Sequence, residues 1–115
     1  MKILLDENIP VQLRDALGGH DVSSVNDKAV GWKNISNGRL LAEMEGRFEV
    51  LITSDRNIYA QQNLARRAIA ILVLPTNRRN DVLHLVPQIV AAIEAISIGQ
   101  YGVLEKDGTF HIRSF

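Results

Sequence analysis

Four short strand-like runs, three of them apolar without alternating polar residues, constrain the fold of this chain most. They cover Lys2–Leu5, Asp21–Val25, Val50–Thr53 and Ile69–Leu74. Runs of this kind are typical of parallel strands that are buried on both faces, because a sheet with one face in water shows alternation. The segments between them have the apolar spacing of helices. We therefore expect a three-layer α/β domain with a mainly parallel sheet between helices.

Helices are expected between and after these strands. The apolar spacing places them from Pro10 to Leu17, from Asn37 to Glu45, from Ile58 to Ala65 and from Val82 to Ile96, with Pro87 restarting the last one. The C-terminal segment differs, because two short runs flank Lys106-Asp107-Gly108, a pattern that predicts a β-hairpin. An isolated hairpin is marginally stable in water, so this one is expected to extend the sheet antiparallel or to pack in a homodimer.

Length and composition exclude several classes of protein. A chain of 115 residues is expected to form one domain, with a core at 1–97 and the hairpin extension at 98–115. The formal net charge is zero, so nucleic acid binding would need a local basic patch. The chain has no cysteine, which excludes disulfides, thiolate catalysis and Cys-ligated zinc. No apolar run approaches the ~20 residues of a membrane span, and no signal peptide pattern is present, so we expect a cytoplasmic protein.

The polar residues after two of the strands are the strongest functional signal. The triplet Asp6–Asn8 follows the first strand, and Asp55–Asn57 follows the third. Parallel strands end at one edge of a sheet, and sites form outside those carboxyl ends. We therefore expect Asp6 and Asp55 to share a site, with Asn37 beside them at the start of the second helix.

Clustered carboxylates repel one another unless a cation lies between them. Mg²⁺ or Mn²⁺ is the expected cofactor, because both prefer oxygen ligands. Asp6 and Asp55 are the expected ligands, with Glu7 as a third, and Asn8 and Asn57 are expected to orient waters and contact substrate. The alternative is that the two aspartates are helix caps or turn formers, and that Glu7 is an exposed acid in a first helical turn.

Four segments together resemble a known family. They are "MKILLDENIP", "ISNGRLLAEME", "VLITSDRNIYAQQNL" and "AILVLPTN". In order and spacing they are similar to small bacterial PIN-like proteins of unknown function, suspected toxins of toxin–antitoxin pairs, and the similarity covers about residues 1–97. It implies a Rossmann-like sheet, Mg²⁺- or Mn²⁺-dependent hydrolysis of RNA, and a cognate antitoxin as partner.

The resemblance also implies roles for individual residues. Asp6 matches the acid after the first strand, and Asp55 matches the acid after the later strand. Asn37 lies in the region where a PIN nuclease carries an acid on a helix, and we include it with the two aspartates as a catalytic residue. This departure from the family pattern makes a catalytically degenerate module, which binds RNA or protein through the same edge, the main alternative.

Basic and aromatic residues near the same edge are candidates for substrate binding. Arg56 and Arg78 follow the third and fourth strands and are expected to bind phosphates. Trp32, in the loop before the second helix, is expected to stack on a base. The alternative for Trp32 is packing as a lid.

A response-regulator receiver domain is a further alternative. Asp55 would then be the phosphoacceptor, with Mg²⁺ beside it and the hydroxyl of Thr76 after the fourth strand. Receivers also need a lysine after a fifth parallel strand. Lys106 is the only lysine near that position, and its place in a hairpin turn counts against this alternative.

Overall fold

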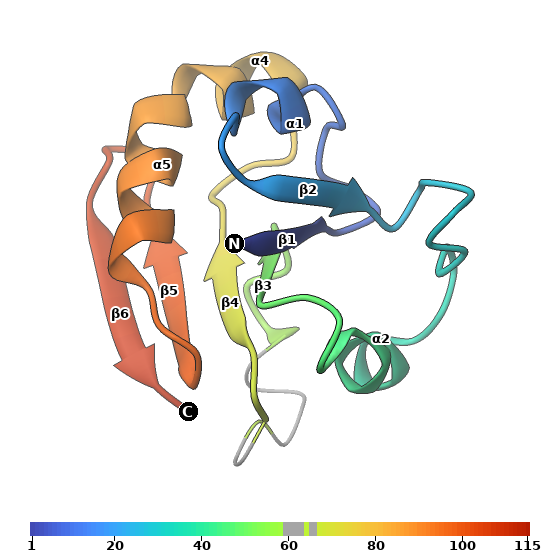
Figure 1. The fold of residues 1–115 in the computed structure, drawn as a ribbon. Coiled ribbons are helices and arrows are strands. Elements are labelled where there is room, and N and C mark those ends of the chain that lie inside the picture. The colour runs from blue at the N-terminus through green and yellow to red at the C-terminus, as the bar shows by residue number, and fades with distance from the viewer. Residues whose placement is uncertain (59–63, 65–66) are drawn as a thin grey trace.

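A single six-stranded sheet forms the centre of the computed structural model, which describes residues 1–58, 64 and 67–115 (Figure 1). The strands are β1 (Lys2–Leu5), β2 (Asp21–Ser24), β3 (Val50–Thr53), β4 (Ala70–Val73), β5 (Gln100–Leu104) and β6 (Phe110–Ser114). Their order across the sheet is β2-β1-β3-β4-β5-β6. All neighbouring pairs are parallel except β5 and β6, which are antiparallel. The predicted α/β fold with a mainly parallel sheet and a terminal hairpin is confirmed.

Each central strand contributes apolar side chains to both faces of the sheet. In β1, Ile3 and Leu5 belong to one hydrophobic cluster while Leu4 belongs to the other, because successive side chains of a strand point to opposite faces. All four residues of β3 and of β4 are buried. The apolar runs without alternation are therefore explained by cover on both faces.

Within the described residues, more helices lie on one face of the sheet than on the other. On one face lie α1 (Leu13–Ala16), α4 (Arg79–His84) and α5 (Val86–Ala95), and on the other lies α2 (Asn37–Met44) (Figure 1). The helix predicted from Val82 to Ile96 is two helices, which meet at Leu85, and Pro87 lies in the first turn of the second one as expected. The helix predicted over 58–65 falls mostly outside the described residues. No helix in the described parts of the chain has the length and apolar character needed to cross a bilayer.

The hairpin extends the sheet as predicted, but it joins the sheet through a parallel pairing and not through the antiparallel one that was expected. β5 pairs in parallel with β4 and antiparallel with β6. Gly102 in β5 makes this packing possible, because a Cβ at this position would lie 2.4 Å from Cζ of Phe110. The Phe110 ring therefore lies over the backbone of β5 and joins the cluster beneath α5.

Candidate functional site

The carboxyl ends of β1 and β3 are neighbours, so the two predicted acids lie at the same edge of the sheet. β1 and β3 pair in parallel, with Leu5 opposite Ile52. The pairing continues beyond β1, because the backbone N–H of Asp6 donates to the carbonyl of Ile52 at 2.9 Å. Asp6 is therefore held against β3, two residues before Asp55 in the register of the sheet.

A buried threonine hydroxyl joins the two acids. Oγ1 of Thr53 donates to Oδ2 of Asp6 at 2.6 Å and accepts from the backbone N–H of Asp55 at 3.1 Å. Asn37, the first residue of α2, donates from Nδ2 to Oδ2 of Asp55 at 3.1 Å. We call Asp6, Asn37, Thr53 and Asp55 the acid cluster. The predicted association of Asp6, Asp55 and Asn37 is thus present in the structure.

Sequence reasoning missed Thr53 as a member of the site. Its side chain is fully buried, at 0% exposure. The signal was a hydroxyl residue at the last position of an otherwise apolar strand, separated from the polar triplet by Ser54 alone. Such a residue at a strand end is ambiguous by itself, because threonine is also common in strands for its branched side chain.

Both aspartates also make local turn bonds. Oδ1 of Asp6 accepts from the backbone N–H of Glu7 at 2.8 Å, and Oδ1 of Asp55 accepts from that of Asn57 at 3.0 Å. In each carboxylate one oxygen therefore makes a turn bond, as the turn-forming alternative predicts. The other oxygen is hydrogen-bonded to a member of the acid cluster. Each carboxylate oxygen has further lone-pair capacity, so these bonds leave room for another ligand.

Glu7 and Asn8 continue the chain beyond Asp6. Glu7 is partly buried, and its Oε1 atom is buried with no hydrogen-bond partner in the described structure. Its backbone carbonyl accepts from Nδ2 of Asn26 at 2.8 Å, which fixes this turn against the loop after β2. Asn8 is exposed. The unsatisfied oxygen of Glu7 is an acceptor that is available to a cation or a hydrogen-bond donor.

The donor set of this edge fits a hard divalent cation only in part. Carboxylate and amide oxygens are the ligands that Mg²⁺ prefers, and Mg²⁺ binds through one or two carboxylates while it keeps several waters. Among the described residues, however, no group of three or more His, Asp or Glu side chains is placed to hold a metal ion. Asp6 and Asp55 could therefore supply two carboxylate ligands to a cation that keeps several waters, and the described residues do not form an all-protein cage.

A further carboxylate at this edge has a structural role. Asp27, after β2, accepts from Nη2 of Arg14 at 2.7 and 2.9 Å and from the backbone N–H of Ser24 at 2.9 Å. The hydrogen bond from Ser24, assisted by Arg14, lowers the pKa of Asp27, although partial burial opposes the change. The charge of Asp27 is thus used to attach α1 to the loop after β2.

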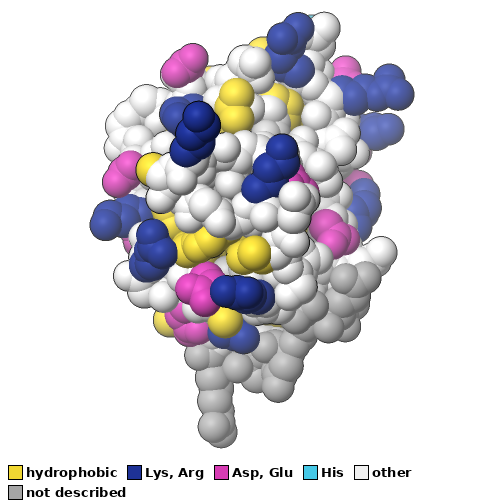
Figure 2. All heavy atoms as spheres, turned by 90° about the vertical axis from the view of Figure 1, so that its right-hand side faces the viewer, with side chains coloured by type: hydrophobic (Ala, Val, Ile, Leu, Met, Phe, Trp, Pro, Cys, Tyr) yellow, Lys and Arg dark blue, Asp and Glu magenta, His cyan; other side chains and the backbone are white. Residues whose placement is uncertain are grey.

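The predicted phosphate-binding arginines lie away from one another. Arg56 turns toward the hairpin, where Nη2 pairs with Oε1 of Glu105 at 3.0 Å. Arg78 is exposed directly before α4, and it lines a surface hollow together with Arg79 and Asn80. On the face that carries α2, Figure 2 shows Lys and Arg side chains spread among Asp and Glu rather than gathered in one patch.

Trp32 does not lie where a base-stacking ring was expected. Its side chain is only 9% exposed, and its ring meets that of Phe48 edge-on, with a centroid distance of 5.8 Å. The guanidinium of Arg47 lies 4.6 Å from the centroid of the indole ring. Arg47 and Phe48 precede β3, so these contacts are made toward the amino end of the sheet. The packing alternative describes this ring, which has almost no free surface for stacking on a base.

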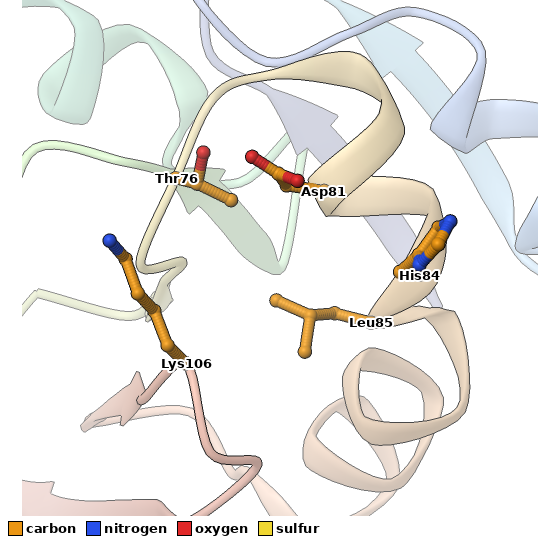
Figure 3. A pocket seen from close by; sticks show the side chains of 5 residues that line it. All are labelled: Thr76, Asp81, His84, Leu85 and Lys106. Atoms are coloured by element: carbon orange, nitrogen blue, oxygen red, sulfur yellow. The ribbon is translucent and has the colours of Figure 1, made fainter.

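A second group of polar residues gathers at the carboxyl ends of β4 and β5. Thr76, Asp81, His84, Leu85 and Lys106 line a pocket of about 380 Å³ between the segment after β4, helix α4 and the hairpin turn (Figure 3). Because β5 is parallel to β4, Lys106 follows a fifth parallel strand, as a receiver requires. A hairpin follows it in place of a helix, and Asp55 is not part of this pocket. The receiver constellation of Asp55, Thr76 and Lys106 is thus not gathered in this pocket.

Comparison of the chain with protein-family models, with curated protein sequences and with solved structures gave no match.

Proposed function

We propose that this protein is a metal-dependent ribonuclease of the PIN-like type, which hydrolyses RNA phosphodiester bonds at the acid cluster. The observation that carries the proposal is the buried hydroxyl of Thr53, which ties Asp6 to the backbone of Asp55 across two neighbouring parallel strands. The bond from Thr53 to Asp55 is local, but the bond to the Asp6 carboxylate joins two strands, and a hydroxyl that positions a carboxylate at the carboxyl edge of a parallel sheet supports a binding site there.

The residues of the cluster have distinct roles in this proposal. Asp6 and Asp55 hold the cation, and Asn37 orients the carboxylate of Asp55 through its 3.1 Å hydrogen bond. Thr53 fixes the orientation of Asp6, in the manner of the outer partners that position metal ligands. A bound Mg²⁺ or Mn²⁺ would supply the acidity that activates a water molecule and would neutralise charge on the phosphate.

The biological setting follows from the family resemblance alone. We propose that the protein is the toxin of a toxin–antitoxin pair in the cytoplasm, with RNA as substrate and an antitoxin as protein partner. The neighbouring reading frame tests this setting, since a small antitoxin gene beside this one supports it.

A non-catalytic module that binds RNA or a partner protein is the second candidate. The observation that favours it is the neutral Asn37 at the position of an expected helix acid, together with the lack of a three-acid group among the described residues. In this candidate the same edge binds its partner without hydrolysis.

Cleavage of a labelled RNA in the presence of Mn²⁺ or of EDTA separates the two candidates. We expect cleavage that requires Mn²⁺ and that falls by more than about a hundredfold in Asp55→Asn, because even the outer partners of metal ligands contribute about 10–100-fold. Asp21→Asn is the matched control, since Asp21 is exposed at the opposite end of β2.

The same variants give a second readout in melting temperature. A ligand that binds only the folded state raises the melting temperature, so Mn²⁺ should stabilise the wild type and Asp21→Asn more than Asp55→Asn. Equal shifts in all three proteins would remove the metal role of Asp55. Mn²⁺ stabilisation without any RNA cleavage would favour the binding module.

A further inference from the structure

The pocket between β4, α4 and the hairpin turn lies on the same edge of the sheet as the acid cluster. β3, β4 and β5 are consecutive neighbours in the sheet, and each ends at this edge in a polar segment. Neighbouring strands are about 4.8 Å apart, so the end of β5 lies about 10 Å from that of β3. The pocket is thus a separate site that is close to the acid cluster.

The charged groups of this pocket have no partner in the part of the chain that the structure describes. Among the described residues, no ion pair or side-chain hydrogen bond involves Lys106, Asp81 or His84. Oγ1 of Thr76 accepts from the backbone N–H of Arg78 at 3.1 Å, which leaves the hydroxyl proton of Thr76 available to donate. In Figure 3 the Lys106 ammonium extends toward Thr76, and Leu85 points into the space between Lys106 and Asp81.

This combination of side chains selects for a ligand with both an anionic group and hydroxyl groups. An ammonium and a hydroxyl side by side bind a phosphate well, because hydrogen bonds to charged groups are strong. The Asp81 carboxylate repels an anion but accepts strongly from a ribose hydroxyl, as acidic residues do in dinucleotide sites. Free phosphate would leave Asp81 without a donor and most of the 380 Å³ empty.

We infer that this pocket binds a 5′-ribonucleotide, with its phosphate on Lys106 and Thr76 and its ribose hydroxyls on Asp81. Leu85 contacts the apolar face of the sugar or base. The ligand is either a free ribonucleotide or the terminal nucleotide of an RNA strand. Only the second source rests on the proposed function, since it requires an RNA strand at the acid cluster that also spans the distance of about 10 Å between the ends of β3 and β5.

Titration of the protein with 5′-AMP and 2′-deoxy-5′-AMP in EDTA, followed by calorimetry, tests the pocket without any cleavage. We expect 5′-AMP to bind about tenfold more tightly than the deoxynucleotide, because the latter lacks one hydrogen bond to a charged acceptor. Lys106→Met should weaken the binding of both by about tenfold or more, whereas Lys33→Met, at an exposed lysine elsewhere, should not.

Asp81→Ala tests the second half of the inference. It should bind the two nucleotides with equal affinity, because the group that distinguishes them is removed. Asp81 and Lys106 are exposed, so both variants are expected to fold, and their melting temperatures check this. Equal binding of 5′-AMP by the wild type and Lys106→Met, or no preference for ribose in the wild type, would overturn the assignment.

A third arm assigns the source of the ligand. A 5′-phosphorylated RNA tetranucleotide is titrated into Asp55→Asn in EDTA, and Lys106→Met is introduced into the same background. Tighter binding of the tetranucleotide than of 5′-AMP, lost with Lys106→Met, supports the pocket and assigns it to RNA. Equal binding of the two supports the pocket and assigns it to a free ribonucleotide. Absence of RNA cleavage in the separate assay with Mn²⁺ would refute the nuclease proposal. It would leave the nucleotide-binding results unchanged, because these are measured in EDTA.

Discussion

The carboxyl ends of β1 and β3 and those of β4 and β5 lie on one edge of the sheet, yet their polar side chains are organised in opposite ways. In the acid cluster every member is hydrogen-bonded to another member, and Thr53 is completely buried. In the pocket, Lys106 and Asp81 have no partner among the described residues and are exposed. Side chains of the protein therefore hold the first region in place, whereas the charged groups of the second have no such support from the described residues.

This difference has a thermodynamic consequence. Removing a partner from a buried hydrogen bond leaves a desolvated group unsatisfied, while removing a solvated polar group costs little. Substitutions in the acid cluster should therefore change the free energy of unfolding, and comparable substitutions at the pocket should change ligand binding alone. The predictions below test this contrast with matched pairs.

The largest effect is expected for Thr53→Val, compared with Thr76→Val. The first substitution leaves Oδ2 of Asp6 and the N–H of Asp55 without their partner, so we expect a loss of about 2–3 kcal/mol in the free energy of unfolding. Thr76 is only partly buried and makes one exposed bond, so its substitution should cost less than about 0.5 kcal/mol. Urea unfolding at neutral pH measures both.

Thr53→Ser is the control for this pair. It keeps the hydroxyl and loses one buried methyl group. We therefore expect Thr53→Ser to be more stable than Thr53→Val and less stable than the wild type by about 1 kcal/mol. Wild-type stability in Thr53→Val, together with a loss of stability in Thr53→Ser, would show that packing of the methyl group and not the hydroxyl stabilises this position.

An intermediate effect is expected for Asn37→Asp. The substitution replaces the donor to Asp55 with a second carboxylate at hydrogen-bond distance, and neighbouring carboxylates repel one another. Without metal, we expect a loss of about 1 kcal/mol, or about 4 °C in melting temperature. With Mn²⁺, the stabilisation should be larger than in the wild type, because the site gains a charged oxygen ligand.

Asn77→Asp is the matched control, because Asn77 is exposed in the segment after β4. It should change neither the melting temperature without metal nor the shift caused by Mn²⁺. If Asn37→Asp behaves in the same way as Asn77→Asp, position 37 lies outside any metal site, and the proposed role of Asn37 is wrong.

The smallest effect concerns Asp27, whose charge is satisfied by Ser24 and Arg14. Its pKa in the folded protein lies below the ordinary value of 3.8, so its contribution is present above pH 3.8 and is lost as the pH falls through the folded pKa. Asp27→Asn should therefore cost about 0.5 kcal/mol at pH 7 and less at pH 3, given the partial exposure of the pair. A cost that does not change with pH would assign the effect to packing.

Part of the candidate site was predictable because strand ends in a parallel sheet have a fixed location. Asp6 and Asp55 each follow a fully apolar run, so their shared edge follows from the fold class. The position of Asn37 follows from the start of the next helix. The contribution of Thr53 was not predictable, because a threonine in a strand gives no sign of which neighbour its hydroxyl will meet.

The contacts of Trp32 and Lys106 were likewise not predictable from the sequence. A loop tryptophan can cover the core or face the solvent, and the contacts with Arg47 and Phe48 place it in the core. Lys106 follows β5, which pairs with β6 on one side and in parallel with β4 on the other. The pairing with β4 brings Lys106 into the same pocket as Thr76. A hairpin pattern predicts only the antiparallel pairing within the hairpin.

The sequence by itself determined the class of the fold, the edge at which acids gather and the existence of the hairpin. These properties depend on local patterns, namely apolar runs, helical spacing and turn residues, each of which acts over a few residues. Only the tertiary structure decided which side chains are hydrogen-bonded and which are left unpaired. Bonds such as that between Thr53 and Asp6 join residues 47 positions apart, and their geometry depends on strand order and register, which no local pattern specifies.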